Sequence, residues 1–430
     1  MSENKRRKVF YADFGCRLNQ FETRVLKNSK DLNLITTQNQ KDADFIVINT
    51  CTVTNRADVK NRQAIRKARL ANPDAHIIVT GCYASTDSDS LKKMDEVNTV
   101  ITNAKKFTIP DFILGKQTDE TINLFPLSNQ SLNQNARAYL KIQDGCNKLC
   151  TYCKIPMSRG KAVSRDMDDT VLEVQNLIKS GFQEIILTGI NIGHYKTNQG
   201  KLNDILKRLA EIHGNHFYRI SSIEPDCIND EFLNIISAEK FAKFLHIPVQ
   251  SGSNHILKSM RRGYSAEKYF ESVYLIKNKI PGIHIGTDVI VGFPGETDDD
   301  FKQTFNLVKK LEFSNVHIFP FSKRTGSEID KILSKQLSSI TTNSVFEING
   351  EIIRNRVQQL IALQEKNKII YIHNTSNRPY RAIIEKIIDN TVYFVTENYF
   401  KGNIVTTNQF QKGDQIQVLY DNDLKFSLVN

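Results

Sequence analysis

Apolar and polar positions alternate along most of this chain in a pattern that predicts many short strands and helices. In the first 125 residues, stretches with helical spacing separate three short apolar runs, and we expect strands at 9–14, 45–50 and 76–81. Short apolar strands that alternate with helices indicate a parallel sheet. We therefore assign residues 1–125 to an N-terminal α/β domain.

A second α/β region follows a polar, low-complexity linker at 126–135. Six of its apolar runs are expected to be strands, at 138–144, 184–190, 217–223, 244–250, 284–291 and 315–321. The stretches with helical spacing lie near 166–180, 202–213, 229–239, 265–279 and 298–312. Six such units favour a partial (β/α)6 barrel over 136–345, with its working face at the carboxyl ends of the strands.

The last part of the chain changes character. Apolar residues at helical spacing over 345–368 predict a helix between barrel and tail, and we place this connecting helix at 346–368. Five short runs with turn signals between them follow, at 379–387, 391–398, 402–408, 414–421 and 425–430. They predict a small C-terminal antiparallel β-barrel over 369–430.

Three of the seven cysteines, Cys146, Cys150 and Cys153, lie within eight residues directly after the first barrel strand. Their C-x3-C-x2-C spacing allows three thiolates to converge on one metal centre. A closed zinc or iron–sulfur site needs four protein ligands. One coordination position is therefore left for something other than protein, as a catalytic metal centre requires.

Three other cysteines, Cys16, Cys51 and Cys82, each follow a strand of the N-terminal domain. The carboxyl ends of parallel strands meet at one edge of a sheet, where sites gather. We therefore expect these thiols to meet, although 35 and 31 positions separate them along the chain. The alternative is three unrelated buried thiols, because free cysteine often behaves as a small core residue. We interpret Cys227 as a structural or incidental thiol.

Composition and charge narrow the class of protein. The net charge of +11 and the pI of about 9.1 favour a polyanionic partner, although a generally basic surface gives the same values. No run of about 18 apolar residues is present, so we expect no membrane span. The first residues show no export signal, and cysteines kept for metal fit a reducing cytoplasm.

The stretch 54–70 has helical spacing and carries six basic residues against one acid, Asp58. A charge run of this kind is usually a solvated helix face. Because it adjoins the edge where three cysteines are expected, we favour a surface that contacts RNA phosphates. The candidate RNA-binding residues are Arg56, Lys60, Arg62, Arg66, Lys67 and Arg69, together with Arg324 from a later loop.

These motifs resemble those of a known family. The loop Gly145-Cys146-Asn-Lys-Leu-Cys150-Thr-Tyr-Cys153 is similar to the signature of the radical S-adenosylmethionine (SAM) superfamily. Gly15-Cys16-Arg-Leu-Asn19, Asn49-Thr-Cys51-Thr-Val-Thr and Gly81-Cys82-Tyr-Ala resemble its methylthiotransferase branch. Within that branch, Lys141-Ile-Gln-Asp-Gly-Cys146-Asn and Thr52-Val-Thr-Asn-Arg-Ala-Asp are most similar to the MtaB-type tRNA enzymes. The resemblance spans nearly the whole chain.

The resemblance implies an enzyme that converts N6-threonylcarbamoyladenosine, at tRNA position 37 next to the anticodon, to its 2-methylthio form. It implies a 4Fe–4S cluster on Cys146, Cys150 and Cys153 that cleaves SAM to a hydrogen-abstracting radical. An auxiliary 4Fe–4S cluster on the other cysteine trio would hold a sulfide that a second SAM methylates. The clusters and SAM, rather than a catalytic side chain, would carry the chemistry, because the adenine C2–H bond is unactivated. A low-potential electron donor and a sulfur source are further implied partners.

Motif position also implies which residues bind SAM. A glycine turn after the second barrel strand would bind the methionine part, polar residues the ribose or amino acid part, and backbone at the fifth strand the adenine. For one candidate, His246, a hydrogen-bonded barrel histidine is an equally good interpretation. The cofactor-binding candidates are Gly189, Glu224, Gln250, His246, Arg262, Val291 and Gly292.

The C-terminal barrel resembles, by position, the tRNA-binding TRAM domain that ends this family. From Ile369 onward, six basic residues are cancelled by six acidic ones. A neutral barrel can still bind RNA with one face, on which Tyr393, Tyr399 and Phe400 would stack on bases. The alternative is a barrel that only packs against the enzyme core.

Two other functions stay open at this point. A sister methylthiotransferase would act on N6-isopentenyladenosine of tRNA or on a ribosomal-protein aspartate. A non-catalytic, metal-stabilised RNA-binding protein would hold zinc or closed clusters in the same cysteine sites.

Overall fold

The computed structural model describes residues 6–29, 31–117, 123–336 and 346–429, and the chain divides into two compact units. The first unit consists of Met1–Gln130, Lys141–Arg165 and Ser322–Asp330. The second consists of Ser131–Leu140, Asp166–Phe321 and Lys331–Asn430. The cysteine loop that follows the first barrel strand therefore belongs to the same unit as the N-terminal residues. In the described ranges, every helix is too short or too polar to cross a membrane.

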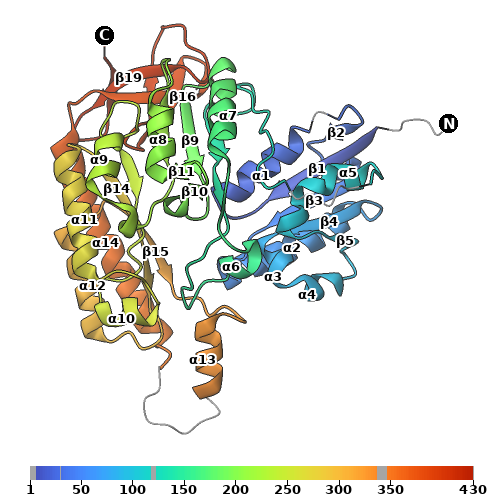
Figure 1. Ribbon diagram of the computed structural model, residues 1–430, viewed down its shortest axis with the longest axis horizontal. Helices are drawn as coiled ribbons and strands as arrows, with labels where there is room; N and C mark the ends of the chain where they lie inside the picture. Colours follow the sequence, from blue (N-terminus) through green and yellow to red (C-terminus); the bar gives the residue numbers. More distant parts are fainter. Residues whose placement is uncertain (1–5, 30, 118–122, 337–345, 430) are drawn as a thin grey trace. The chain divides into compact units, whose positions relative to one another are not determined.

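The first unit is built on a parallel sheet with the strand order β2-β1-β3-β4-β5 (Figure 1). Its strands are β1 (Arg7–Asp13), β2 (Leu34–Thr36), β3 (Phe45–Thr50), β4 (His76–Gly81) and β5 (Thr99–Val100). The three strands that the sequence predicts are the central ones. The edge strands β2 and β5 were not predicted, because two or three residues carry too little alternation to be recognised.

Helices bury both faces of this sheet. On one face Ile46 packs with Ile65 of α2 (Asn55–Ala71), and on the other Val47 packs with Leu26 of α1 (Arg17–Lys27). Burial on both sides explains why β3 reads as a nearly continuous apolar run. The remaining elements of this unit are η1 (Gln40–Asp42), α3 (Cys82–Thr86), α4 (Ser88–Lys92), η2 (Asn103–Thr108), α5 (Ile109–Ile113), β7 (Gln143–Asp144), α6 (Ile155–Arg159) and β8 (Val163–Ser164).

The second unit contains two three-stranded sheets. One has the order β12-β9-β6, with β6 (Ala138–Lys141), β9 (Glu184–Thr188) and β12 (Phe217–Ile220). The other has the order β13-β14-β15, with β13 (Phe244–His246), β14 (His284–Val291) and β15 (Asn315–Pro320). A parallel bridge between Tyr218 and Phe241 joins the two sheets. All six strands lie within the ranges that the sequence predicts.

Helices follow these strands in the expected alternation (Figure 1). Several begin at a capping side chain: Asp166 accepts hydrogen bonds from two backbone amides of its helix, and Thr297 forms a capping box with Asp300. The helices are α7 (Met167–Lys179), α8 (Leu202–Ala210), α9 (Asp230–Ile236), α10 (Asn254–Ser259), α11 (Ala266–Lys279), α12 (Asp298–Lys310) and α13 (Glu328–Gln336), with the short segments η3 (Ile192–His194), β10 (Lys196–Thr197), β11 (Gly200–Lys201) and η4 (Pro225–Cys227).

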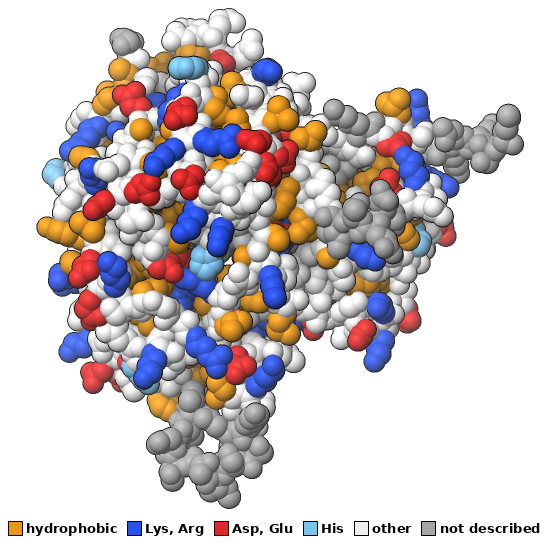
Figure 2. All heavy atoms as spheres, viewed as in Figure 1, with side chains coloured by type: hydrophobic (Ala, Val, Ile, Leu, Met, Phe, Trp, Pro, Cys, Tyr) orange, Lys and Arg blue, Asp and Glu red, His pale blue; other side chains and the backbone are white. Residues whose placement is uncertain are grey.

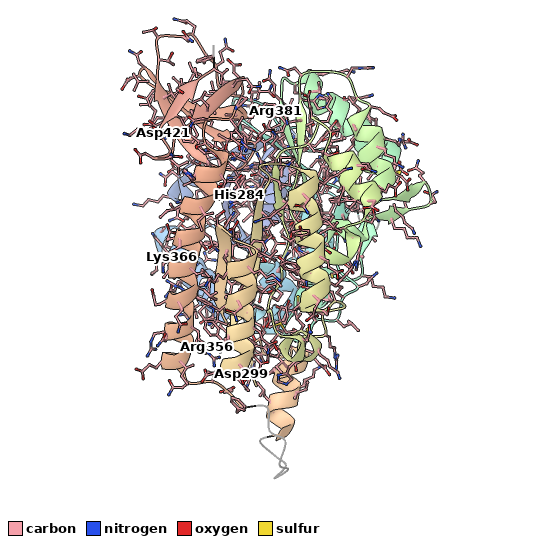
Figure 3. The ribbon with its side chains drawn as sticks, turned by 90° about the vertical axis from the view of Figure 1, so that its left-hand side faces the viewer. His284, Asp299, Arg356, Lys366, Arg381 and Asp421 are labelled. Atoms are coloured by element: carbon pink, nitrogen blue, oxygen red, sulfur yellow. The ribbon has the colours of Figure 1, made fainter. Side chains whose placement is uncertain are left out.

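The long connecting helix α14 (Gly350–Thr375) packs along the second unit (Figure 3). Residue 345, where its pattern starts in the sequence, lies outside the described residues, and the helix runs on to Thr375 rather than ending at 368. Near its start, the Arg356 guanidinium donates to Glu296 at 2.6 Å and to Asp298 at 2.7 Å. Further along, Asn367 donates to the backbone carbonyl of Val308 in α12 and to that of Phe313 in the loop after it.

The C-terminal strands form a nearly closed antiparallel sheet with the order β18-β17-β16-β19-β20. They are β16 (Tyr380–Ile388), β17 (Thr391–Thr396), β18 (Lys401–Val405), β19 (Gln415–Tyr420) and β20 (Phe426–Leu428). The edge strands β18 and β20 approach each other closely. A β-carbon built on Gly402 of β18 would lie only 2.7 Å from the Phe426 ring of β20. The small antiparallel barrel that the sequence predicts is thus present in outline.

This C-terminal sheet packs against the amino ends of the strands of the second unit. The buried Arg219 of β12 donates to Glu184 at 2.5 Å and to the backbone carbonyls of Thr396 and Glu397. Tyr399 stacks on Phe244, with ring centroids 4.6 Å apart. The carboxyl ends of β13 and β14, where the candidate rim residues lie, are at the other end of the strands.

Two of the three expected base-stacking rings are used in this packing. Tyr399 stacks on the first residue of β13, and Phe400 stacks on His284, the first residue of β14, with centroids 5.3 Å apart. The expectation that these two rings stack on RNA is therefore not supported. Tyr393 has the Lys386 ammonium 4.5 Å from its ring centroid, and its contact with RNA stays a prediction.

Candidate cluster sites and cofactor-binding residues

The three cysteines of the N-terminal sheet lie at one edge. Cys16 precedes α1, Cys51 follows β3, and Cys82 begins α3, while the register aligns Thr50 with Gly81 at the strand ends. Burial, with a smaller effect of the nearby Cys16 and Cys82, raises the pKa of the Cys51 thiol to about 11. The structure therefore brings the three thiols together as a group, as the strand ends predict.

Glycine at position 15 makes this approach possible. Gly15 has a φ of +91°, and a β-carbon built there would lie 2.3 Å from the Cys51 β-carbon. Buried amides hold the backbone around the group: Asn19 donates to the Thr50 carbonyl at 2.9 Å, and Asn61 donates to the Cys51 carbonyl at 2.5 Å. The loops that carry the thiols are thus fixed by interactions that satisfy buried polar groups.

The second cysteine trio lies in a loop that backbone hydrogen bonds shape. The Cys146 amide donates to the Gly160 carbonyl at 3.1 Å, and the Cys153 amide donates to the Cys150 carbonyl at 3.1 Å. Two backbone amides donate to sulfur: that of Lys148 to Cys146 at 3.3 Å, and that of Ile155 to Cys153 at 3.4 Å. Amide donors directed at sulfur stabilise thiolates and tune the potential of an iron–sulfur centre.

A buried charge network lies beside both cysteine trios in the first unit. Glu22 and Asp144 are its carboxylates, and Lys106, Lys141 and Arg159 are its cations. Burial alone would raise the pKa of Glu22, but Arg159, Lys106 and Lys141 hold it well below its usual range. The network thus contains three basic groups and two carboxylates, a surplus of one basic group.

Two basic groups of this network lie near the thiols of the N-terminal sheet. Desolvation by the surrounding protein raises the pKa of the Cys16 thiol, although this residue is solvent-exposed, and Arg159 opposes the rise. Arg159 and Lys106 both interact electrostatically with Cys82, whose sulfur is also 3.5 Å from the Asn103 amide nitrogen. A cationic surplus beside three thiols fits a centre that holds them as thiolates.

Arg324 occupies a different place from the one that the sequence suggested. Its side chain is only 4% exposed, and its guanidinium donates to Thr52 at 2.6 Å, to Asp58 at 2.6 Å and to Asn55. The segment 322–330 is thereby attached to the start of α2. A guanidinium buried in this way does not support the predicted RNA contact of Arg324, because both of its terminal nitrogens already donate to protein groups.

The basic residues of α2 divide into two groups. Arg69 donates to the Pro73 and Ala75 carbonyls and to Asn98, and Arg62 donates to the Tyr83 hydroxyl at 2.7 Å, so both have structural contacts. The other four predicted RNA-binding residues of α2 are solvent-exposed, although one of them, Arg66, also pairs with Glu96 at 3.5 Å: Arg56, Lys60, Arg66 and Lys67. The exposed four are the stronger candidates for phosphate contacts.

The candidate SAM-binding residues lie in the second unit, at or after the carboxyl ends of its strands except for Arg262, which lies between α10 and α11. Gly189 follows β9 directly. Glu224 and Arg262, two of these candidates, pair with each other at 2.5 Å, and the Arg262 guanidinium lies 5.1 Å from the Tyr264 ring centroid. Figure 2 shows that basic and acidic side chains are interspersed on the surface of this unit that faces the viewer.

Gln250 has a left-handed backbone, with a φ of +67°. Its amide donates to the Asp288 carbonyl and its carbonyl accepts from Ile290, so pairing with β14 holds it in this conformation. Non-glycine residues rarely adopt such angles, and they cluster at functional sites. The structure therefore gives Gln250 a distinctive position beyond its motif.

The expected backbone contact of Val291 and Gly292 with adenine is partly occupied by protein. The Val291 carbonyl accepts from the Phe321 amide at 2.8 Å, and the Gly292 amide donates to the Glu296 carboxylate at 2.9 Å. Gly292 has a φ of +80°, and a β-carbon there would lie 2.6 Å from the Ile353 side chain. Contact of these two residues with SAM stays a prediction.

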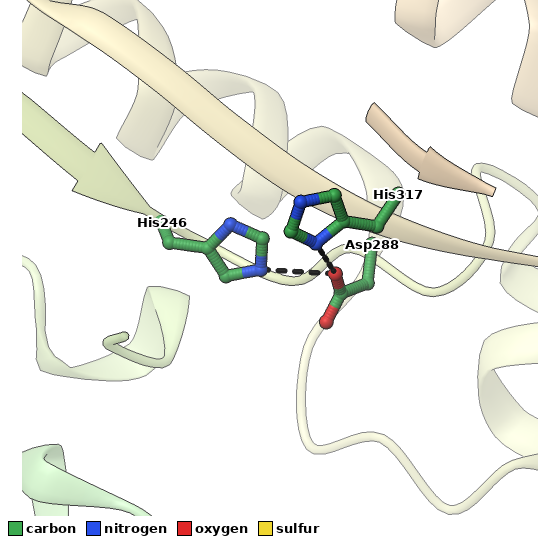
Figure 4. A group of neighbouring side chains, drawn as sticks. All are labelled: His246, Asp288 and His317. Carbon is green, nitrogen blue, oxygen red and sulfur yellow. Dashed lines mark hydrogen bonds and ion pairs between the residues drawn. The ribbon is translucent and has the colours of Figure 1, made fainter. Parts of the chain in front are cut away.

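His246 forms a hydrogen bond with a neighbouring strand, as the second of its two interpretations expects, and its contact with SAM stays a prediction. Its Nε2 lies 3.0 Å from Asp288 Oδ1, and the same oxygen is 3.1 Å from Nδ1 of His317 (Figure 4). The His246 and His317 rings stack, with centroids 5.1 Å apart. Cys227, outside both trios, has its sulfur 3.7 Å from an Asp226 carboxylate oxygen.

Sequence reasoning missed two sets of residues. It did not single out the charge network around Glu22, whose members come from separated segments and share no local motif. It also missed Asp288 and His317 as a pair, although both lie on predicted strands. The available signal was period-two alternation, which places Gly286 and Asp288 on the same face of β14.

Comparison with known proteins defines the class. Residues 140–308 match the family model described as the radical SAM superfamily, and residues 8–102 match one described as uncharacterized protein family UPF0004. A solved structure of the radical S-adenosylmethionine methyltransferase TsrM from Kitasatospora setae aligns with a TM-score of 0.58. That alignment covers 78% of this chain and 77% of the other at 13% identity, so it is a likeness of fold.

Curated relatives define the family within that class. Threonylcarbamoyladenosine tRNA methylthiotransferase MtaB of Bacillus subtilis (strain 168) is 35% identical over 416 residues, which cover 91% of this chain and 89% of that protein. The tRNA-2-methylthio-N(6)-dimethylallyladenosine synthase of Protochlamydia amoebophila (strain UWE25) is 31% identical over 376 residues, covering 84% and 81%. This chain belongs to the radical SAM methylthiotransferase family. Membership implies SAM and 4Fe–4S clusters as its cofactors.

Proposed function

We propose that this chain methylthiolates C2 of N6-threonylcarbamoyladenosine at position 37 of tRNA. The carrying observation is structural: two groups of three thiols lie in one compact unit, and a shared network of buried charges lies beside them. Identity and coverage are both higher for the relative named after threonylcarbamoyladenosine than for the one named after dimethylallyladenosine. These two facts favour the threonylcarbamoyl substrate.

The two thiol groups would hold the two clusters. We assign Cys146, Cys150 and Cys153 to the cluster that meets SAM, and Cys16, Cys51 and Cys82 to the auxiliary cluster. Clusters bound there would supply one-electron reduction of SAM and a carrier for sulfur. The protein supplies three thiolates at each site, amide donors to two sulfurs of the first, and a cationic surplus beside the second.

The second unit would bind SAM and orient the adenine. We infer that its two three-stranded sheets are the two parts of a partial (β/α)6 barrel, whose carboxyl-end residues face the cofactor. Glu224, paired with Arg262, offers a fixed carboxylate, and Gln250 offers a side chain held by its backbone. The hydroxyls and amino group of SAM are hydrogen-bond donors that suit such acceptors.

The remaining partners follow from the reaction. The four exposed cations of α2 would contact tRNA phosphates near the auxiliary cysteines. A low-potential electron donor must reduce the cluster that meets SAM, and a sulfur source must replenish the auxiliary one. The proposed reaction and its RNA substrate together favour a cytoplasmic localisation.

Three cysteine variants test the division of labour. After anaerobic reconstitution, about eight irons per chain are expected from two clusters of four. Cys150→Ala should abolish SAM cleavage, whereas Cys51→Ala should keep SAM cleavage and lose methylthio transfer. Cys227→Ala is the matched control, because its thiol belongs to neither trio, and it should keep both activities. If Cys51→Ala also failed to form deoxyadenosine, the product that reports SAM cleavage, the assignment of roles to the two cysteine trios would be wrong.

Mass spectrometry of tRNA nucleosides tests the substrate. A strain that lacks this protein should lose 2-methylthio-N6-threonylcarbamoyladenosine and keep 2-methylthio-N6-isopentenyladenosine. The opposite pattern would assign the chain to the sister reaction. Zinc in place of iron, together with no SAM cleavage, would instead favour a non-catalytic RNA-binding protein.

A further inference from the structure

Three polar side chains form a cluster on neighbouring strands of the second unit (Figure 4). His246 ends β13, Asp288 lies within β14, and His317 lies within β15, where it pairs directly with Asp288 in the parallel register. Both histidines approach Oδ1 of Asp288, at 3.0 and 3.1 Å. Each of the three residues offers one potential ligand atom, and these three atoms all lie within 4.8 Å of one another.

This cluster lies on the face of the sheet that points away from the helices. The neighbouring Thr287 points the other way and shares a hydrogen bond of 3.0 Å with the Tyr269 hydroxyl of α11. Asp288 therefore points to the opposite face, because side chains alternate along a strand. On that face His317 is 55% exposed and Phe319, two residues further along β15, is 39% exposed. The face combines an aromatic surface with polar groups that a ligand can reach.

The carboxylate fixes the protonation pattern of the two rings. Both histidine partners lower the pKa of Asp288 against the effect of burial, so its carboxyl group is ionised and can only accept hydrogen bonds. His246 must then carry a proton on Nε2, and His317 must carry one on Nδ1. The other ring nitrogen of His317, Nε2, lies on the exposed side of the ring, where the protonated ring would present a second N–H to a ligand.

The absence of a side chain at Gly286 leaves space for this arrangement. A β-carbon on Gly286, which also lies on this face, would be 2.9 Å from Nδ1 of His246. The cluster also adjoins a candidate cofactor residue, since the Gln250 amide donates to the Asp288 carbonyl at 2.8 Å. The group of His246, Asp288 and His317 therefore lies on the same strands as the proposed SAM site, near their carboxyl ends.

We propose that His317, oriented by Asp288 and backed by His246, binds the carboxylate of the threonyl group and so selects the substrate; this rests on the proposed function. The threonylcarbamoyl substituent ends in a carboxylate, whereas the isopentenyl substituent is a hydrocarbon. An imidazolium N–H is a charge-assisted donor to a carboxylate and has no partner on a hydrocarbon. Phe319 beside it offers a surface for the apolar part of the nucleoside. His317 is the residue that touches the substrate, and Asp288 is a positioning residue.

The experiment compares two substrates that differ only at this carboxylate. One is tRNA that bears N6-threonylcarbamoyladenosine, and the other is the same tRNA after carbodiimide coupling of the carboxylate to methylamine. For the reconstituted wild-type protein we expect kcat/KM for methylthio transfer to fall about 10- to 100-fold on amidation, as for loss of one charge-assisted hydrogen bond. Filter binding of the two tRNAs should show the same preference without turnover.

His317→Leu should remove the preference. Transfer to the carboxylate tRNA should fall to the level of the amide tRNA, while transfer to the amide tRNA stays within about threefold of wild type. His317→Gln, which keeps a neutral donor of similar size, should retain part of the preference and guards against a folding defect. Asp288→Asn should weaken the preference and leave SAM cleavage intact. His213→Leu, at an exposed histidine elsewhere in this unit, is the matched control and should behave as wild type.

Two outcomes would overturn the proposal. In the first, His317→Leu lowers transfer to both tRNAs equally, or keeps the wild-type preference, which would leave the residue with a structural role. In the second, metal analysis of the wild type finds a divalent ion in addition to the iron of the two iron–sulfur clusters, and His317→Leu lacks that ion. This result would make the His246, Asp288 and His317 group a metal site. Failure of the proposed function itself looks different, because wild type would then modify neither threonylcarbamoyl tRNA nor its amide.

Discussion

The buried charge network around Glu22 allows a quantitative test of what holds the two cysteine sites in place. We consider Arg159→Gln. The Arg159 guanidinium donates to both oxygens of Glu22 at 2.9 Å, to Asp144 at 3.0 and 3.1 Å, and to Asn19 at 2.8 Å. Its side chain is 1% exposed. Glutamine keeps some hydrogen-bonding capacity but removes the charge from a site that water does not reach.

The expected loss follows from the remaining partners. Breaking a buried ion pair by removing one member typically costs about 3–5 kcal/mol. Glu22 would keep Lys106 and Lys141, and Asp144 would keep Lys141, so neither carboxylate is left alone. We therefore expect a loss of about 3 kcal/mol, at the lower end of that range. Arg159→Lys, which keeps the charge but loses the paired donors, should lose less.

The measurement must report on the first unit alone, because a chain of two units need not unfold in one step. Hydrogen exchange of the amides in β1, β3 and β4 provides this, since those strands form the centre of the first sheet. The control is Arg66→Gln, which removes a largely exposed ion pair with Glu96 in the same unit and should cost less than about 1 kcal/mol. If Arg159→Gln cost as little as this control, the network would not stabilise the unit in the way described.

Three further predictions concern other parts of the chain. Gly15→Ala should prevent assembly of the auxiliary cluster, because the added β-carbon would collide with that of Cys51, and the measurement is the iron content. The control is Gly115→Ala, at a glycine that is also left-handed but has open space around it, and it should retain the iron. Burial lowers the pKa of His284 to about 4, so the unfolded chain binds a proton there that the folded protein does not. Stability should therefore fall by about 2 kcal/mol between pH 7 and pH 5, and His284→Gln should reduce this slope in urea unfolding. Lys60→Glu on the exposed face of α2 should weaken tRNA binding and lower the slope of log K against log salt by about one, whereas unchanged binding would exclude this face from the RNA contact.

The comparison of sequence and structure separates local from non-local information. The positions of the longer strands were predictable because alternation and apolar runs are local signals, whereas the short edge strands β2 and β5 were missed. The meeting of Cys16, Cys51 and Cys82 was predictable because each follows a strand, and parallel strands end at the same edge. The spacing of Cys146, Cys150 and Cys153 needed no fold at all.

Other features depended on packing between distant segments. The sequence suggested RNA contacts for Arg324 and Tyr399, yet the structure buries the first against Asp58 and stacks the second on Phe244. A basic or aromatic residue has the same local pattern whether it faces solvent or another element. Only the docking of one segment on another decides between the two, and periodicity carries no record of it.

The sequence by itself thus determined the chemistry that this protein can perform: six cysteines in two trios, set where strands end. The tertiary structure decided the environment of that chemistry. It placed a surplus positive charge beside the auxiliary thiols, and it aligned Asp288 with His317 across two strands. The physical reason is that electrostatic and hydrogen-bonding energies depend on distances between atoms, and strand register and helix packing set these distances between residues far apart in the chain.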